Sequence, residues 1–309
     1  MPIYFPESPD FGVFFNEDKT LTIKEYKGIS ATIEIPEKIG VFTVTKIAPD
    51  FCRDTANVYC VHMPNSITEI GDGAFYGCYD LAKINLSEKL KEIPRMFCGL
   101  SYISSINIPD SVTRIGADAF RDCKSLKIAD IGKNTKSIDG FAFSNCDIEE
   151  LHIGPNLKEI DYSLGFLSFN YNLKTITVDK DNSSFRDIDG ILFSKNEDTL
   201  IKFPGCAVKP STNAPYVFYS VPNSVKNIAK LAFEGCCFNK VKFTKDIEGV
   251  NECFSYSFIY NPDALIICKE GSTAEKFAKK NKIKTQLIGK SISDFLEEVS
   301  KEEKEQKSK

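Results

Sequence analysis

The chain has 309 residues, with 39 Lys and Arg against 43 Asp and Glu, and therefore a formal net charge of −4. Hydrophobic residues make up 42% of it, which is typical of a globular protein with a buried core. The mild acidity argues against general binding to nucleic acids or anionic membranes, because such binding needs a basic surface. No run approaches 18 apolar residues, so no membrane span is expected.

The N-terminal residues and the cysteines both indicate in which cellular compartment the protein is expected. Residues 1–7 have neither a basic stretch nor an apolar core, so they do not match a secretory signal peptide. The 11 cysteines form no C-x-x-C pair, which argues against a zinc ribbon or a thioredoxin-like redox site. Without a signal peptide, free thiols in a cytoplasmic, reducing environment are the simplest interpretation.

Residues 11–24 predict a β-hairpin. Apolar residues flank a polar run at 16–19, and alternation resumes at Leu21, Thr22 and Ile23. We expect residues 1–30 to form an N-terminal cap containing this hairpin, because the repeated region that follows needs its first apolar face covered.

From residue 31 onward the chain repeats one pattern. Segments 61–78, 106–123 and 221–236 are three copies of it, and their apolar anchors are each followed by Ile or Val seven residues later. From Met63 to Ile153 the chain advances 90 residues in four steps. The firm anchors are Met63, Leu86, Ile108, Ile131, Ile153, Val221 and Phe243. Looser anchors at Ile35, Val178, Phe203 and Ile267 extend the array to about eleven turns of 22–25 residues.

Each repeat predicts two short strands. The anchor and the residue two positions before it are apolar and the residue between them is mostly polar, which indicates a strand with one buried face. The Ile seven residues later begins a second segment on the opposite wall. One unit cannot bury its apolar face alone, so residues 31–268 predict a β-rich solenoid whose parallel strands stack about 4.8 Å apart.

Two slots of the repeat account for part of the content of 24 Phe and 11 Cys. The first slot holds Phe75, Phe97, Phe120, Phe143 and Phe233. The second slot holds Cys78, Cys123, Cys146 and Cys236. We interpret these cysteines as small buried apolar side chains stacked from turn to turn, with a disulfide or metal ladder as the alternative.

The end of the array is less regular. Residues 204–220 contain three prolines and predict a kink or an irregular loop. Residues 273–281 predict a helix with Ser272 or Thr273 at its N-cap, and residues 291–299 a second helix. We assign 269–299 as a C-terminal helical cap, although the second helix could instead mediate dimerisation or lie on a membrane surface. The charged tail 300–309 is expected to be disordered.

The sequence carries no recognisable catalytic or metal-binding constellation. Its two histidines, His62 and His152, both precede anchors and fall four rungs apart, roughly 19 Å at the strand spacing of a sheet. They can therefore share neither a metal ion nor a nucleophile. The acidic run near 179–189 lacks the spacing of an EF-hand loop. We expect no catalytic residue, no metal and no cofactor, and hence no enzyme.

The outward positions of the strand ladder are the candidate binding residues, because the core does not need them. The alternative is that this face contacts only solvent and binds no partner. This outward row comprises Glu34, His62, Asn85, Asn107, Asp130, His152, Thr177, Lys202, Ser220 and Lys242. A flanking row comprises Lys83, Ser105, Glu150, Thr175 and Lys240. Repeat proteins use extended polar faces of this kind to hold protein partners.

The unit, roughly I-x-I-P-x-S-V-x-x-I-G-x-x-A-F-x-x-C-x-x-L, resembles the BspA-like leucine-rich repeats of bacteria and mucosal protists over about residues 31–268. Residues 189–201 are similar to a family variant with an extra hairpin, and 271–280 to its closing segment. The resemblance implies a non-enzymatic, protein-binding module at the cell surface or secreted, with adhesion to a host or extracellular-matrix protein. The alternative is an intracellular scaffold or assembly protein, which the missing signal and the many cysteines favour.

Overall fold

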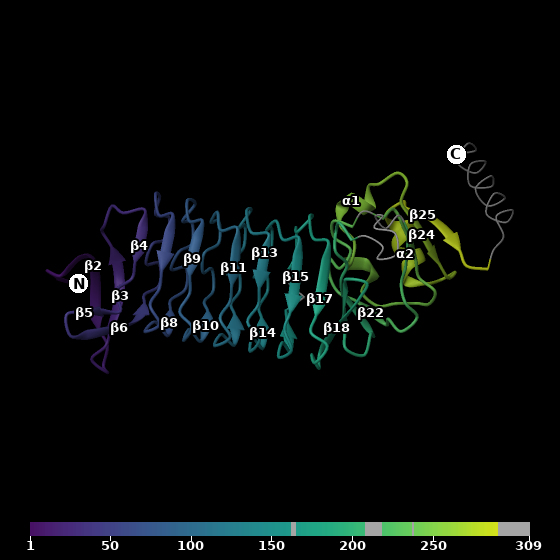
Figure 1. The fold of residues 1–309 in the computed structure, drawn as a ribbon. Coiled ribbons are helices and arrows are strands. Elements are labelled where there is room, and N and C mark those ends of the chain that lie inside the picture. Colours follow the sequence, from purple (N-terminus) through teal and green to yellow (C-terminus); the bar gives the residue numbers. More distant parts are fainter. Residues whose placement is uncertain (162–164, 208–217, 237, 290–309) are drawn as a thin grey trace.

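The computed structural model describes residues 1–161, 165–207, 218–236 and 238–289. The chain winds into an elongated stack of short strands with the N-terminus at one end (Figure 1). The predicted β-solenoid of about eleven turns is confirmed. No helix in these four segments is long and apolar enough to cross a membrane.

One wall of the stack consists mainly of the strands that contain an anchor or end directly before one, and we call it the first ladder. Its strands pair in parallel within three sheets, and the apolar middle residue of each strand lies opposite its counterpart, as in Ile33, Val61 and Ile84. The strands are β4 (Thr32–Glu34), β7 (Cys60–His62) and β9 (Lys83–Asn85); β11 (Ser105–Asn107), β13 (Ile128–Asp130), β15 (Glu150–Ile153) and β17 (Thr175–Val178); and β21 (Phe218–Ser220), β23 (Lys240–Lys242), β24 (Leu265–Cys268) and β25 (Lys284–Leu287).

For the five anchors from Met63 to Ile153, the Ile seven residues later lies in a second ladder, as the repeat predicts. Val250, seven residues after Phe243, lies instead in a 3-10 turn. Each two-residue strand of the second ladder buries its Ile, and in most of these strands the preceding residue is exposed. These strands are β8 (Glu69–Ile70), β10 (Glu92–Ile93), β12 (Arg114–Ile115), β14 (Ser137–Ile138) and β16 (Glu159–Ile160).

A column of phenylalanine rings fills the space between the two walls. Phe75, Phe97, Phe120 and Phe143 are fully buried, and successive ring centroids lie 5.7, 6.0 and 5.1 Å apart. Rings at this spacing contact both neighbours, so the column contributes to the cohesion of successive turns.

Three of the four slot cysteines, Cys78, Cys123 and Cys146, are buried as expected, whereas Cys236 is half-buried. The three buried thiols also donate hydrogen bonds. Cys78 Sγ donates to the carbonyl oxygen of Cys52 at 2.7 Å, Cys123 Sγ to that of Cys98 at 3.3 Å, and Cys146 Sγ to that of Phe120 at 3.1 Å. Each acceptor belongs to an earlier turn. The slot therefore suits a small apolar side chain that can also satisfy a carbonyl group.

Burial predicts a sharp contrast in thiol reactivity. Burial raises the pKa of Cys78 to about 12 and that of Cys52 well above the usual range, so neither forms the reactive thiolate near neutral pH. Cys206 is exposed. We expect a maleimide to label Cys206 in the native protein, while Cys52 and Cys78 react only after denaturation. Peptide mass spectrometry measures this, and rapid native labelling of Cys78 would contradict the buried slot.

The N-terminal hairpin is confirmed. Strands β2 (Ser8–Phe15) and β3 (Leu21–Tyr26) pair antiparallel, and β1 (Ile3–Phe5) adds to the outer edge of β2. Strand β3 then pairs in parallel with β6 (Phe42–Ile47), which pairs with β5 (Lys38–Ile39) and with β8. The hairpin therefore continues the second ladder at its N-terminal end.

A second hairpin interrupts the array and corrects one sequence-based assignment. Strands β18 (Phe185–Ile188), β19 (Ile191–Ser194) and β20 (Thr199–Lys202) pair antiparallel, and β20 then pairs in parallel with β22 (Asn227–Ile228). The sequence placed Phe203 as an anchor of the first ladder, but the strand before it belongs to the sheet of β22. That assignment is wrong, because the inserted hairpin places β20, the strand before Phe203, beside β22 and not in the first ladder.

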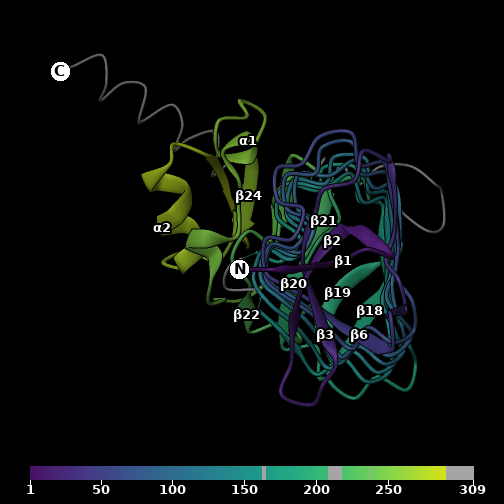
Figure 2. The ribbon, with the colours of Figure 1, turned by 90° about the vertical axis from the view of Figure 1, so that its left-hand side faces the viewer.

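Beyond this hairpin the structure is displaced sideways. In the end-on view, α2 (Thr273–Lys280) and β24 lie beside the projected stack of N-terminal turns (Figure 2). The predicted helix is confirmed: the Ser272 hydroxyl accepts a hydrogen bond from the Glu275 backbone N–H at 3.3 Å. A four-residue helix, α1 (Tyr256–Ile259), and a 3-10 turn at Val250–Glu252 precede it.

Two of the expected segments cannot be compared with the structure. The helix expected at 291–299 and the tail at 300–309 lie outside the described residues, as does most of the irregular segment 204–220. The division into caps, array and tail stays a prediction.

Candidate functional site

Nine of the ten residues assigned to the outward row lie at exposed or half-buried positions of the first ladder. The strand register aligns Glu34, His62 and Asn85 across three neighbouring strands. It also aligns Asn107, Asp130, His152 and Thr177 across four strands, and Ser220 with Lys242. The ladder thus presents a polar row whose side chains are not required by the core.

Lys202 is the exception, and its assignment to the row is wrong. Its side chain is 6% exposed, and its Nζ lies 3.9 Å from Glu234 Oε2. The same amine donates to the carbonyl oxygens of Leu231 and Glu234 at 3.3 and 3.4 Å. Because β20 belongs to the other sheet, Lys202 points into the protein and cannot contact a partner docked on the first ladder.

The two histidines make only local contacts. His152 Nδ1 lies 3.0 Å from Thr177 Oγ1 on the next strand. His62 Nε2 lies 3.3 Å from Cys60 Sγ and 3.8 Å from Glu34 Oε1. Since thiol and carboxylate approach the same ring nitrogen, Glu34 does not orient the imidazole toward the thiol in the manner of a catalytic triad. No cluster of three metal-ligating side chains occurs among the described residues.

Sequence reasoning missed the exposed apolar and aromatic side chains beside the row. Ile128 is 61% exposed on β13, next to the aligned Asp130. Tyr59, Tyr79 and Tyr102, 51–61% exposed, precede β7, β9 and β11 on three successive turns. The signal was available, because an Ile stands where the flanking row is otherwise polar. Exposed tyrosines are common among the residues that dominate protein interfaces.

A charged bridge borders the central sheet of the first ladder. Glu149 accepts from Lys174 Nζ at 2.6 Å and lies 3.4 Å from Lys127 Nζ. The hydrogen bond from Lys174, followed by that from Lys127, lowers the pKa of the Glu149 carboxyl. All three side chains reach solvent, so the bridge contributes little to stability.

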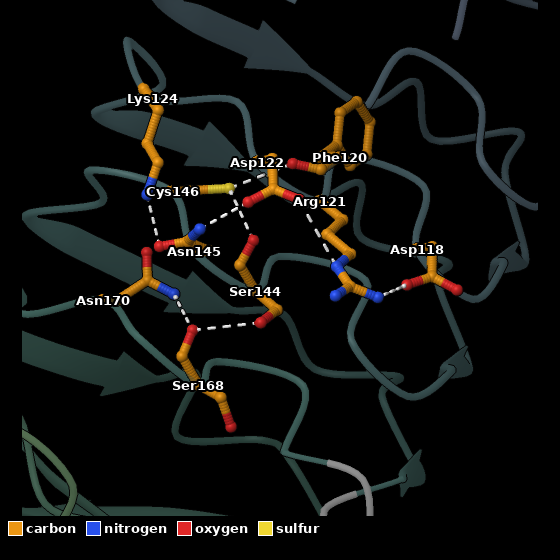
Figure 3. A network of polar contacts seen from close by, with 10 residues as sticks. All are labelled: Asp118, Phe120, Arg121, Asp122, Lys124, Ser144, Asn145, Cys146, Ser168 and Asn170. Carbon is orange, nitrogen blue, oxygen red and sulfur yellow. Dashed lines mark hydrogen bonds and ion pairs between the residues drawn. The ribbon is translucent and has the colours of Figure 1, made fainter. Parts of the chain in front are cut away.

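The turns that carry the Phe and Cys slots hold a separate polar network (Figure 3). Asn145 donates to Asp122 and accepts from Lys124, while Ser144 Oγ donates to the Ser168 carbonyl at 3.2 Å. Asn170 occupies the cysteine slot of its turn and donates to the Phe143 carbonyl at 2.7 Å. These contacts satisfy backbone groups of neighbouring turns, so we assign the network a structural role.

Short parallel strands stacked at a constant repeat, with an apolar column inside, define a leucine-rich repeat solenoid. A sequence profile described as a BspA type leucine-rich repeat region (6 copies) matches residues 45–164, 94–220, 163–263 and 212–297. The chain belongs to this BspA-type leucine-rich repeat family. Comparison with curated proteins gives no match.

Several solved structures share the fold. The pneumococcal vaccine antigen PcpA is 23% identical with a TM-score of 0.67, and the match covers 80% of this chain and 66% of that one. A leucine-rich cell surface protein from Faecalibacterium prausnitzii A2-165 is 21% identical with a TM-score of 0.61, covering 96% and 97%. A leucine-rich repeat protein from Bacteroides ovatus is 20% identical with a TM-score of 0.55, covering 85% and 70%. The present chain thus spans just under two thirds of the pneumococcal antigen. Repeat families of this class are typically protein-interaction modules rather than enzymes.

Proposed function

We propose that this protein is a non-enzymatic module that holds a protein partner on the exposed face of the first ladder. The observation that supports it is the outward row, which is in register from Glu34 to Asn85 and again from Asn107 to Thr177. Its polar side chains alternate with buried ones and are not required by the core. Ile128 and the three exposed tyrosines add apolar contact area beside the polar row. A mixed face of this kind suits protein recognition, which combines apolar anchors with a polar rim.

Two variants test this face. Lys240→Glu with Lys242→Glu reverses two charges on β23, and Ile128→Ser removes the exposed apolar side chain on β13. The bait is the full chain, incubated with cytosol and with host extracellular-matrix extract. We expect the partner captured by the wild type to be recovered about tenfold less with at least one variant, because charge reversal and loss of an interface anchor weaken complexes.

The control variant makes the same change in charge on the second ladder. Lys136→Glu with Lys158→Glu alters two exposed lysines just before β14 and β16 of the second ladder. All variants should melt within a few degrees of the wild type, since the changed side chains are exposed or, at Lys242, half-buried. Equal recovery of the partner by every variant would place its binding site away from the first ladder.

We further propose adhesion to a host or neighbouring-cell protein as the role of this binding. Its support is the family membership together with the fold shared with a cell surface protein. Protease shaving of intact cells should release peptides of this chain. A chain untouched by protease on intact cells, but digested after lysis, would contradict adhesion.

An intracellular scaffold is the second candidate. The observation that favours it is that eight of the ten described cysteines are buried as thiols outside any disulfide, which suits a reducing compartment. Recovery of a partner from cytosol alone, with no peptides released by shaving, would favour this candidate.

A further inference from the structure

Cys60 differs from the other buried cysteines in the side of the sheet on which it lies. On strand β7 the fully buried Val61 points into the core, so Cys60 and His62 on either side of it point to the outer face of the first ladder. Among the eight buried cysteines of the described segments, seven belong to the apolar core, and Cys60 alone lies outside it. The packing of the core therefore does not require a thiol at this position.

The thiol of Cys60 is covered by side chains that themselves reach solvent. Cys60 is 7% exposed, and Thr32 on β4 and Lys83 on β9 are paired in register with it on the two neighbouring strands. Lys83 is exposed, Thr32 is half-buried, and the side chain of His62 is 44% exposed. Movement of these side chains gives a small molecule access to the sulfur without opening either ladder.

An imidazole lies directly beside this thiol. Cys60 Sγ is 3.3 Å from His62 Nε2, and Glu34 Oε1 is 3.8 Å from the same nitrogen. In the tautomer that carries its proton on Nδ1, Nε2 can accept the proton of the thiol. The positive charge that forms on the imidazole then lies between the thiolate and the Glu34 carboxylate, which both attract it. The geometry therefore suits transfer of a proton from Cys60 to His62.

We propose that Cys60 is a modification site that forms a mixed disulfide with a small-molecule disulfide such as oxidised glutathione. His62 takes the proton from Cys60 Sγ, and the thiolate attacks one sulfur of the disulfide. The sulfur–sulfur bond of glutathione breaks, a new one forms to Cys60, and the departing glutathione thiolate takes the proton from His62. One thiol is consumed and one is released, so the disulfide is the only oxidant required. This site does not depend on the proposed binding of a protein partner.

The test incubates the folded full chain with oxidised glutathione near neutral pH and follows each cysteine by peptide mass spectrometry. We expect glutathione on Cys60, while Cys52 and Cys78 in the core stay unmodified. His62→Gln should slow the modification of Cys60 about tenfold or more, because proton transfer to a positioned imidazole is lost. The exposed Cys206 is the internal reference, and its rate should be the same in both proteins.

His152→Gln is the matched control, because it makes the same substitution at the outward position of β15 on the same face. The ring of His152 contacts Thr177, so its loss should leave the rate at Cys60 unchanged. The side chain of His62 is 44% exposed, so His62→Gln should melt within a few degrees of the wild type. A slower reaction of this variant then reports the chemistry of the site and not a change in folding.

Three results would overturn the proposal. The first is a Cys60 that stays unmodified while Cys206 reacts. The second is an equal rate at Cys60 in the wild type and in His62→Gln, which would show that the imidazole takes no part. The third is a Cys60 that reacts no faster than Cys52, because the reaction would then require unfolding of the ladder.

Discussion

Replacement of Phe120 by Ala is expected to lower the free energy of unfolding by about 3–5 kcal/mol. Phe120 is fully buried, and its ring lies between those of Phe97, edge-on at 6.0 Å, and Phe143, stacked at 5.1 Å. Truncation to Ala leaves a cavity against both neighbouring turns, and the ladders on either wall limit how far the turns can collapse to fill it.

Chemical denaturation measures this loss, and hydrogen exchange locates it. Because each turn of a solenoid contacts mainly its neighbours, exchange should accelerate most in the turns around residues 93–143 and least in the N-terminal hairpin. Phe169→Ala is the control, since that ring is 43% exposed and should cost far less. A loss below about 1 kcal/mol for Phe120→Ala would mean that the column of rings is not a principal source of cohesion.

The array could be predicted from the sequence because its signal recurs. Seven anchors with an Ile or Val at a constant offset indicate both walls, and for the five anchors from Met63 to Ile153 the structure places the Ile at this offset in the second ladder. The Phe and Cys slots were identified for the same reason. A position that recurs on every turn has one environment, so its residue type reports burial directly.

Lys202 shows where this reasoning failed. The sequence around it, Leu200-Ile201-Lys202-Phe203, has the alternation of a first-ladder strand, with Lys202 at the outward position. The inserted hairpin carries this strand to the other sheet, and a periodic template cannot anticipate such a change of wall.

The burial of Lys202 also changes how partner binding can be tested. Charge reversal at this position would set two carboxylates against each other at a buried site, because Glu234 Oε2 lies 3.9 Å from Nζ. The protein would then lose stability, and loss of partner capture would follow from unfolding. Lys240 and Lys242 are suitable substitutes, because Lys240 is exposed and Lys242 half-buried on the first ladder.

Replacement of Glu234 by Ala is expected to destabilise the protein by about 3–5 kcal/mol, because it leaves the Lys202 ammonium buried without its counter-charge. Glu234 is 4% exposed, and its Oε2 also accepts from the backbone N–H of Phe169 at 2.8 Å. Lys202→Met combined with Glu234→Leu should cost less than Glu234→Ala alone, because no unpaired charge remains. Thermal and urea denaturation compare the variants, and Glu69→Ala, at an exposed ion pair, should change little.

The pH dependence of this loss separates a buried charge from lost packing. Burial lowers the pKa of Lys202 from its usual value of 10.5, so the unfolded chain binds this proton more tightly than the folded one does. The penalty for burying the ammonium is therefore present at neutral pH and is relieved as the pH rises toward 10.5. Without Glu234 the penalty is larger, so the stability gap between Glu234→Ala and the wild type should narrow at alkaline pH. A gap that stays constant from neutral to alkaline pH would show that Glu234 stabilises this junction by packing and by its bond to Phe169, and not by neutralising Lys202.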